Sequence, residues 1–123
     1  MANRIRQFDT GANRDAEDGK YDYAGFLDPA VLHAFAGYMH SCRQLPDGSM
    51  RAGGNWKSGI PLDSYVGSML RHVMDLWMLH EGHEVTRPET DHHVTLADAL
   101  GGILFNCQGY WSETLKSQHG QPT

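Results

Sequence analysis

A segment in the middle of the chain combines cations, glycines, an amide and an indole, which are the groups that an anion-binding site needs. Residues 51–61 read Arg-Ala-Gly-Gly-Asn-Trp-Lys-Ser-Gly-Ile-Pro. Glycines leave backbone N–H groups accessible, and such groups bind anionic oxygens together with cations. Trp56 can stack on a base and Asn55 can orient it, while Arg51 and Lys57 can contact phosphate. The alternative interpretation is a glycine-rich turn whose Trp56 fills the core.

The helix predicted after this segment carries a polar face. Its members follow one another at spacings of three and four residues: Ser64, Ser68, Arg71, His72 and Asp75. Residues at these spacings are neighbours on a helix surface. An arginine fork can form two parallel charge-assisted bonds with phosphate, so Arg71 and His72 are candidate phosphate ligands. The alternative is a solvent-exposed face on which Arg71 pairs with Asp75.

Positive charge is concentrated around these two groups. Between residues 43 and 71 the chain has four basic side chains (Arg43, Arg51, Lys57 and Arg71) and two acidic ones, although its formal net charge is −5. Arg14 and Lys20 offer two further cations nearer the N-terminus. We expect these cations to converge on one anion.

A second candidate site is acidic. Glu81, Glu84, Asp91 and Asp98 lie in a stretch that also contains His83, His92 and His93. Carboxylates suit Mg²⁺, and histidines suit Zn²⁺ or another transition metal. Glu81 and Glu84 fall where a helix ends, however, and a metal site on helices would have its carboxylates mid-helix.

Three helices must position these groups. The first begins at Asp28 and Pro29, which suit the N-cap and first helical positions, and continues to Cys42. The second begins at Pro61 and ends near Gly82. The third begins at Thr95, whose hydroxyl can cap the first turn with Asp98 three residues on, and continues past Trp111. The loops at 1–27 and 44–60 are expected to be ordered.

The apolar residues of the second and third helices are expected to form the core. On the second helix these residues are Leu62, Val66, Met69, Leu70, Val73, Leu76 and Trp77. On the third they are Leu96, Leu100, Ile103, Leu104, Cys107, Tyr110 and Trp111. Met74 and Met78 flank the second helix, and small domains often complete their cores by association, so we predict a homo-oligomer. On the third helix, Gly102 and Gly109 predict close helix approach, and Asn106 in the same row can reach a ligand.

Composition narrows the class of protein. A chain of 123 residues with 40% hydrophobic residues predicts one all-α domain over residues 1–123, loosely ordered at 1–10 and 118–123. The negative net charge argues against a general nucleic-acid binder. No apolar run is long enough to span a membrane, and the N-terminus lacks the apolar core of a secretory signal. With Cys42 and Cys107 read as reduced thiols, a cytoplasmic protein is expected.

Several short motifs resemble the family named for the N-terminal domain of phage dATP/dGTP diphosphohydrolases. The resemblance covers roughly residues 11–113. The motifs are Gly11-Ala-Asn-Arg14, Asp18-Gly-Lys20, Leu27-Asp-Pro29, Asn55-Trp56 with Gly59-Ile-Pro61, Ser68-Met-Leu-Arg71-His72 and Leu104-Phe-Asn106. Asn-Trp-x-x-Gly and Arg-His are the specific elements. The resemblance implies a phage origin, a mostly helical fold and a nucleotide partner in an infected bacterial host.

The family's relatives also bear on catalysis. The all-α MazG-like pyrophosphohydrolases hold Mg²⁺ with a Glu-x-x-Glu pair and a later Glu-x-x-Asp pair, and this chain matches only the first, at Glu81 and Glu84. We therefore expect a nucleotide-binding protein without a cofactor that sequesters a phosphate-bearing nucleotide, such as a host immune signal, without turnover. The alternative is a Mg²⁺-dependent dATP/dGTP pyrophosphohydrolase that uses Glu81, Glu84, Asp91 and Asp98. A third class is a protein-binding inhibitor.

Overall fold

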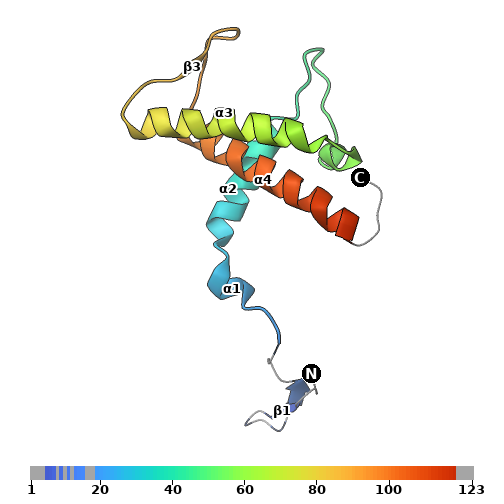
Figure 1. Ribbon diagram of the computed structural model, residues 1–123. Coiled ribbons are helices and arrows are strands. Elements are labelled where there is room, and N and C mark those ends of the chain that lie inside the picture. Colours follow the sequence, from blue (N-terminus) through green and yellow to red (C-terminus); the bar gives the residue numbers. More distant parts are fainter. Residues whose placement is uncertain (1–4, 8, 10, 12, 16–18, 119–123) are drawn as a thin grey trace. The chain divides into compact units, whose positions relative to one another are not determined.

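The computed structural model of the chain describes residues 5–7, 9, 11, 13–15 and 19–118 (Figure 1). The chain divides into two compact units, Met1–Leu32 and His33–Thr123. Helices dominate the second unit, as the sequence predicts. The prediction of loose order at residues 1–4, 8, 10 and 119–123 lies outside the described residues.

The first unit contains a small hairpin and a single helical turn. Strands β1 (Ile5–Gln7) and β2 (Asn13–Asp15) pair antiparallel. The turn α1 (Tyr23–Phe26) begins at Asp22, whose Oδ1 accepts a hydrogen bond from the Gly25 N–H at 2.9 Å. A side chain at position 25 would collide with this carboxylate, so the cap requires a glycine there. The sequence did not predict the hairpin, because strands this short have no detectable period.

Helix α2 (Pro29–Ser41) starts where its N-terminal residues predict. The Asp28 carboxylate accepts a hydrogen bond from the Ala30 N–H at 2.9 Å, which satisfies one of the free donors of the first turn. The unit boundary falls inside this helix, and its C-terminal part belongs to the second unit.

The segment between α2 and α3 is held by hydrogen bonds, as expected for an ordered loop. A turn at Leu45–Ser49 brings Gln44 and Met50 together in an antiparallel bridge. The Arg51 N–H then donates to the Arg43 carbonyl at 2.9 Å. The chain next forms a short 3₁₀ helix, η1 (Asn55–Ser58), which carries Trp56 and Lys57. The loop therefore folds back on the end of α2 before α3 begins.

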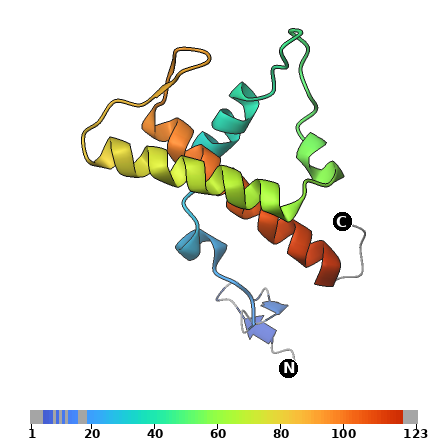
Figure 2. The same ribbon diagram turned by 45° about the horizontal axis from the view of Figure 1, so that its top comes forward.

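Two long helices form the main layer of the second unit (Figures 1 and 2). Helix α3 (Leu62–His80) and helix α4 (Leu96–Gln118) pack against each other and are joined by the hairpin β3 (Thr86–Arg87) and β4 (His92–His93). Both internal boundaries agree with the sequence. Gly82, at φ +91°, closes α3 through bonds from Gly82 N to Leu79 O and from His83 N to Met78 O.

Helix α4 begins with reciprocal capping between Thr95 and Asp98. The Asp98 N–H donates to Thr95 Oγ1 at 3.1 Å, and the Thr95 N–H donates to Asp98 Oδ2 at 2.9 Å. This is the capping-box arrangement that the spacing of the two residues predicts. The Asp98 carboxylate therefore takes part in capping the N-terminus of α4.

Glycines on α4 let aromatic rings from the other helices lie against its backbone. A Cβ at Gly109 would collide with the Tyr65 ring, one at Gly102 with the His72 ring, and one at Gly101 with the Tyr38 ring of α2. All three glycines are buried. The close helix approach predicted for Gly102 and Gly109 is confirmed, and it fixes the registers of α3 and α2 on α4.

The expected core was wrong for much of α3 and α4. Among the described residues, Tyr65, Val94 and Ala99 are the buried apolar residues. Residues assigned to the core are exposed instead: Leu62, Val66, Leu70, Val73, Trp77, Leu96, Leu100, Leu104, Cys107, Tyr110 and Trp111. The physical reason is that the glycine contacts turn the opposite side of α3, with Tyr65, His72 and Asp75, toward the rest of the unit.

The glycine contacts predict the outcome of adding one methyl group. Gly109→Ala should lower the free energy of unfolding by about 1–3 kcal/mol, because the Cβ overlaps the buried Tyr65 ring. Gly67→Ala on α3 is the matched control: its Cβ would meet only Arg71 Nη1, at 3.6 Å. That variant should gain up to about 1 kcal/mol from helix propensity. Urea denaturation measures both, and equal effects would contradict the packing.

Candidate functional site

A cavity of about 550 Å³ lies between α2, the 42–61 loop, α3 and α4. Its volume is within the range of small-molecule sites. The lining residues that can recognise a ligand are Tyr38, His40, Cys42, Arg43, Arg51, Asn55, Trp56, Ser68, His72 and Asn106. No Asp or Glu of the described part of the chain lines it. Two arginine residues therefore line the cavity, and no carboxylate residue of the described part of the chain lines it with them.

The two arginines are positioned by contacts between the end of α2 and the loop. Arg43 Nε donates to the Arg51 carbonyl at 2.9 Å, while the Arg51 N–H donates to the Arg43 carbonyl. Arg43 Nη1 also lies 3.3 Å from His40 Nδ1, one helical turn earlier. These contacts tie the Arg43 side chain and the Arg51 backbone to each other at the cavity wall.

Trp56 forms an aromatic part of the wall. Its ring meets the Phe105 ring of α4 edge-on, with centroids 5.9 Å apart and an interplanar angle of 84°. Lys57 Nζ lies 5.6 Å from the centroid of the Trp56 ring, within cation–π range. The indole is only partly buried, so it is not sealed in the core.

The C-terminal turn of α4 holds the segment that carries Trp56. Lys116 Nζ donates to the Lys57 carbonyl at 2.9 Å and to Glu113 Oε1 at 3.1 Å. Glu113 is buried and lies near Tyr65, whose hydroxyl has no hydrogen-bond partner among the described residues. Burial, and then the Glu113 charge, raise the pKa of Tyr65.

His72 contributes a neutral imidazole to the cavity. Burial lowers its pKa below the ordinary 6.5, the Arg87 and Arg71 charges lower it further, and Asp75 and Asp98 oppose the shift. Its Nδ1 is buried, lies 4.0 Å from Asp75 Oδ2, and makes no hydrogen bond within the described structure. A neutral ring nitrogen of this kind can donate or accept a hydrogen bond, depending on its tautomer.

Asp75 is buried behind His72 and is held by an ion pair. Arg87 on β3 donates from Nη2 to Asp75 Oδ2 at 2.6 Å and from Nη1 to Oδ1 at 3.4 Å. The pair ties the 86–93 hairpin to the middle of α3. Asp75 does not line the cavity, and its carboxylate is occupied by Arg87 rather than by Arg71.

Five of the ten candidate ligand-binding residues line the cavity: Arg51, Asn55, Trp56, His72 and Asn106. Lys57, Arg71 and Asp75 lie near it without lining it. Arg71 is exposed, and its Nη2 donates to Ser68 Oγ at 3.0 Å. Arg14, in β2, and Lys20 belong to the first unit.

Sequence reasoning missed His40 and Arg43 as members of the site. Arg43 was counted only as part of the local positive charge. The available signal was the Pro46-Asp-Gly turn, which reverses the chain so that Arg51 returns to the end of α2. His40 precedes Arg43 by one helical turn, and this spacing also indicates a shared face.

The acidic candidate residues do not gather in the structure. Glu81 ends α3, Glu84 follows in the loop, Asp91 lies in the hairpin turn and Asp98 caps α4. Among the described residues, no group of three His, Cys, Asp or Glu side chains is arranged to hold a metal. Burial raises the pKa of Asp98, but hydrogen bonds from Thr95 and His92 outweigh it and leave the pKa lowered.

Comparison with known proteins found no matching family model, curated protein or solved structure. The family resemblance drawn from the sequence motifs therefore stays a prediction. None of the described helices is long and apolar enough to cross a membrane.

The lowered pKa of His72 predicts how stability depends on pH. The folded state binds this proton less readily than the unfolded state does, so the free energy of unfolding falls as pH drops through 6.5 toward the lowered pKa. Above pH 6.5 this contribution is constant. Urea titrations between pH 5 and 8 should give a shallower slope for His72→Asn than for the unsubstituted chain. Parallel slopes would show that His72 titrates normally.

Proposed function

We propose that the cavity binds a phosphate-bearing nucleotide and holds it without chemical change. The observation that carries the proposal is the lining: Arg43 and Arg51 face a cavity beside Trp56, and no carboxylate from the described residues lines it. Arginine forks suit phosphate, and an indole offers a stacking surface that tolerates any base. The cavity has both kinds of group within one volume of nucleotide-compatible size.

In this proposal each lining group has a separate task. Arg51 and Arg43 bind phosphate oxygens, and the His40 ring lies beside Arg43. Trp56 contacts the base or ribose, while Asn55 and Asn106 supply orienting hydrogen bonds. Asn106 is buried, and one N–H of its Nδ2 donates to the Gly102 carbonyl at 2.7 Å, so its oxygen and its second N–H are left for a ligand. Arg71 lies at the rim, where Ser68 holds its guanidinium.

Capture rather than turnover is proposed because the described residues that line the cavity supply binding groups and no carboxylate that could act as a general base. The sequence resemblance extends the proposal to a phage protein that sequesters a host signal nucleotide in the cytoplasm of an infected bacterium. We also propose that the protein works as a homo-oligomer, since so few of its apolar side chains are buried within one described chain.

The test is a binding and recovery experiment. The protein is incubated with nucleoside triphosphates, nucleoside monophosphates and cyclic dinucleotides, with and without Mg²⁺, and the supernatant and the heat-released material are analysed. Recovery of unchanged nucleotide only after heating supports capture. Mg²⁺-dependent release of pyrophosphate would replace capture by the pyrophosphohydrolase alternative. Absence of binding to every nucleotide contradicts the proposal.

Two substitutions predict which groups carry the affinity. Arg51→Ala should weaken nucleotide binding about 10- to 100-fold, because it removes a charge-assisted bond worth about 1.5–3 kcal/mol. Trp56→Leu should weaken it by a similar factor through lost stacking, worth about 1–3 kcal/mol per base. Isothermal titration calorimetry gives both values.

Arg71→Ala is the matched control for Arg51→Ala, because it removes the same charge from the neighbouring surface but no lining group. Its effect should be smaller than that of Arg51→Ala. Complete loss of binding in Arg71→Ala with full binding in Arg51→Ala would move the phosphate contact to the Arg71–His72 pair.

A further inference from the structure

Two uncharged polar side chains of the cavity meet at one glycine of α4. The His72 ring of α3 lies so close to Gly102 that a Cβ at that position would collide with it. Asn106 lies one helical turn further along α4 and donates from Nδ2 to the Gly102 carbonyl at 2.7 Å. Both side chains belong to residues that line the cavity. We call His72 and Asn106 the neutral pair.

The His72 ring offers one uncharged nitrogen to a ligand. Burial lowers the pKa of this residue below 6.5, so the ring is neutral at pH 7. Nδ1 is buried and makes no hydrogen bond within the described structure, whereas the side chain as a whole exposes 21% of its surface. Nε2 is therefore the ring nitrogen left for a ligand. A neutral imidazole nitrogen forms one hydrogen bond, as donor or as acceptor, and brings no charge that would attract phosphate.

The hydrogen bond to Gly102 determines which way the Asn106 amide is turned. Only the NH₂ group can donate to a carbonyl, so the amide oxygen and the second N–H are the groups left for a ligand. An amide carries this acceptor and this donor in one plane. It can therefore form two hydrogen bonds with the edge of a nucleobase, as asparagine does with N6 and N7 of adenine.

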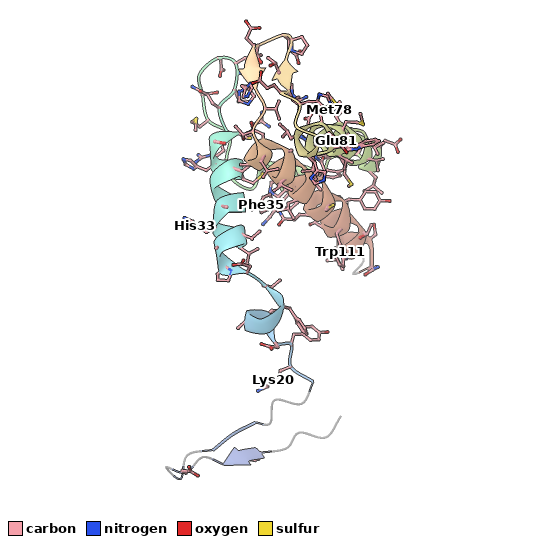
Figure 3. All side chains as sticks on the ribbon, turned by 90° about the vertical axis from the view of Figure 1, so that its left-hand side faces the viewer. Lys20, His33, Phe35, Met78, Glu81 and Trp111 are labelled. Atoms are coloured by element: carbon pink, nitrogen blue, oxygen red, sulfur yellow. The ribbon has the colours of Figure 1, made fainter. Side chains whose placement is uncertain are left out.

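The stacking surface of the cavity lies beside the neutral pair. The Trp56 ring meets the Phe105 ring edge-on at 5.9 Å, and Phe105 directly precedes Asn106 on α4. Arg43 and Arg51 line the cavity from the loop that continues beyond the end of α2 (Figure 3). The wall therefore has a cationic part on the loop and an uncharged part on the two long helices.

We propose that His72 and Asn106 bind the hydrogen-bonding edge of the nucleobase and so make the cavity selective for one kind of base. The inference rests on the proposed function, in which the arginines hold phosphate. It adds that stacking on Trp56, which tolerates any base, is not what decides the base that is held. A base that does not match leaves the neutral pair without hydrogen-bond partners, and one such two-bond contact discriminates by about 5- to 150-fold.

The test measures affinities for the ribonucleoside monophosphates and triphosphates of adenine, guanine, cytosine and uracil by isothermal titration calorimetry. Within one phosphate class, the best and the worst base should differ at least about tenfold. Asn106→Leu and His72→Leu should each reduce this ratio to about threefold or less, because each removes the hydrogen-bonding groups of one side chain. Equal affinities of the unsubstituted chain for the four bases would overturn this inference and leave the proposed function intact. Absence of binding to every nucleotide would overturn both.

Two further variants separate base selectivity from other effects. Gln108→Leu removes an exposed amide from the same helix at a position that does not line the cavity, so the ratio should not change. Arg51→Ala should weaken binding of all four bases by the same factor and also preserve the ratio. A ratio that falls as far in Arg51→Ala as in Asn106→Leu would overturn the inference.

A measurement on the unsubstituted chain keeps the inference testable if Asn106→Leu and His72→Leu fail to fold. Nucleotides of purine and of 2-pyrimidinone keep the rings that stack on an indole, but they lack the amino or oxo group that the natural bases carry at C6 or C4. They should bind at least about tenfold more weakly than the best natural base of the same ring type with the same number of phosphates. Equal affinity would show that stacking alone holds the base and would overturn the inference.

Discussion

The second unit depends on the close approach of aromatic rings to the backbone of α4 at three glycines. Gly101, Gly102 and Gly109 accept Tyr38, His72 and Tyr65, and no other residue type leaves room for these rings. Rings that carry polar atoms therefore lie directly against the backbone of α4. This contact determines which side of α3 turns inward, and with it the position of the cavity and the exposure of the apolar residues on the other side of α3.

The sequence predicted helix boundaries well because capping is local. Asp28, Thr95 with Asp98, and Gly82 each act through bonds to residues within a few positions, so their types and spacing are sufficient. Which side of α3 packs against the rest of the second unit was not predictable in the same way. The sequence pattern assigns apolar residues to the core. This assignment fails for α3, because the glycines of α4 pack against the side of α3 that carries the Tyr65 and His72 rings. The hairpins were missed because their strands have two or three residues.

The candidate site was predictable in part for a related reason. One short segment contains Arg51, Asn55 and Trp56. Because these residues are close in sequence, they also line the same cavity. Long-range pairings could not be read from spacing. The sequence made Asp75 a candidate ligand-binding residue, with a pair to Arg71 on its own helix as the alternative, but Arg87 reaches it from β3 with two hydrogen bonds. The return of Arg51 to Arg43 likewise depends on a turn whose direction is set by the fold.

Lys116 links parts of the molecule that are remote in sequence. Its ammonium group donates a hydrogen bond to the carbonyl of Lys57, 59 positions earlier. This bond links the last turns of α4 to the segment that carries Trp56. The part of the cavity wall that carries Trp56 is thus fixed by a residue of α4, the helix that also lines the cavity through Phe105 and Asn106. Because this contact can form only after α4 has been synthesised, the segment that carries Trp56 gains this support later in translation than helices α2 and α3 are made.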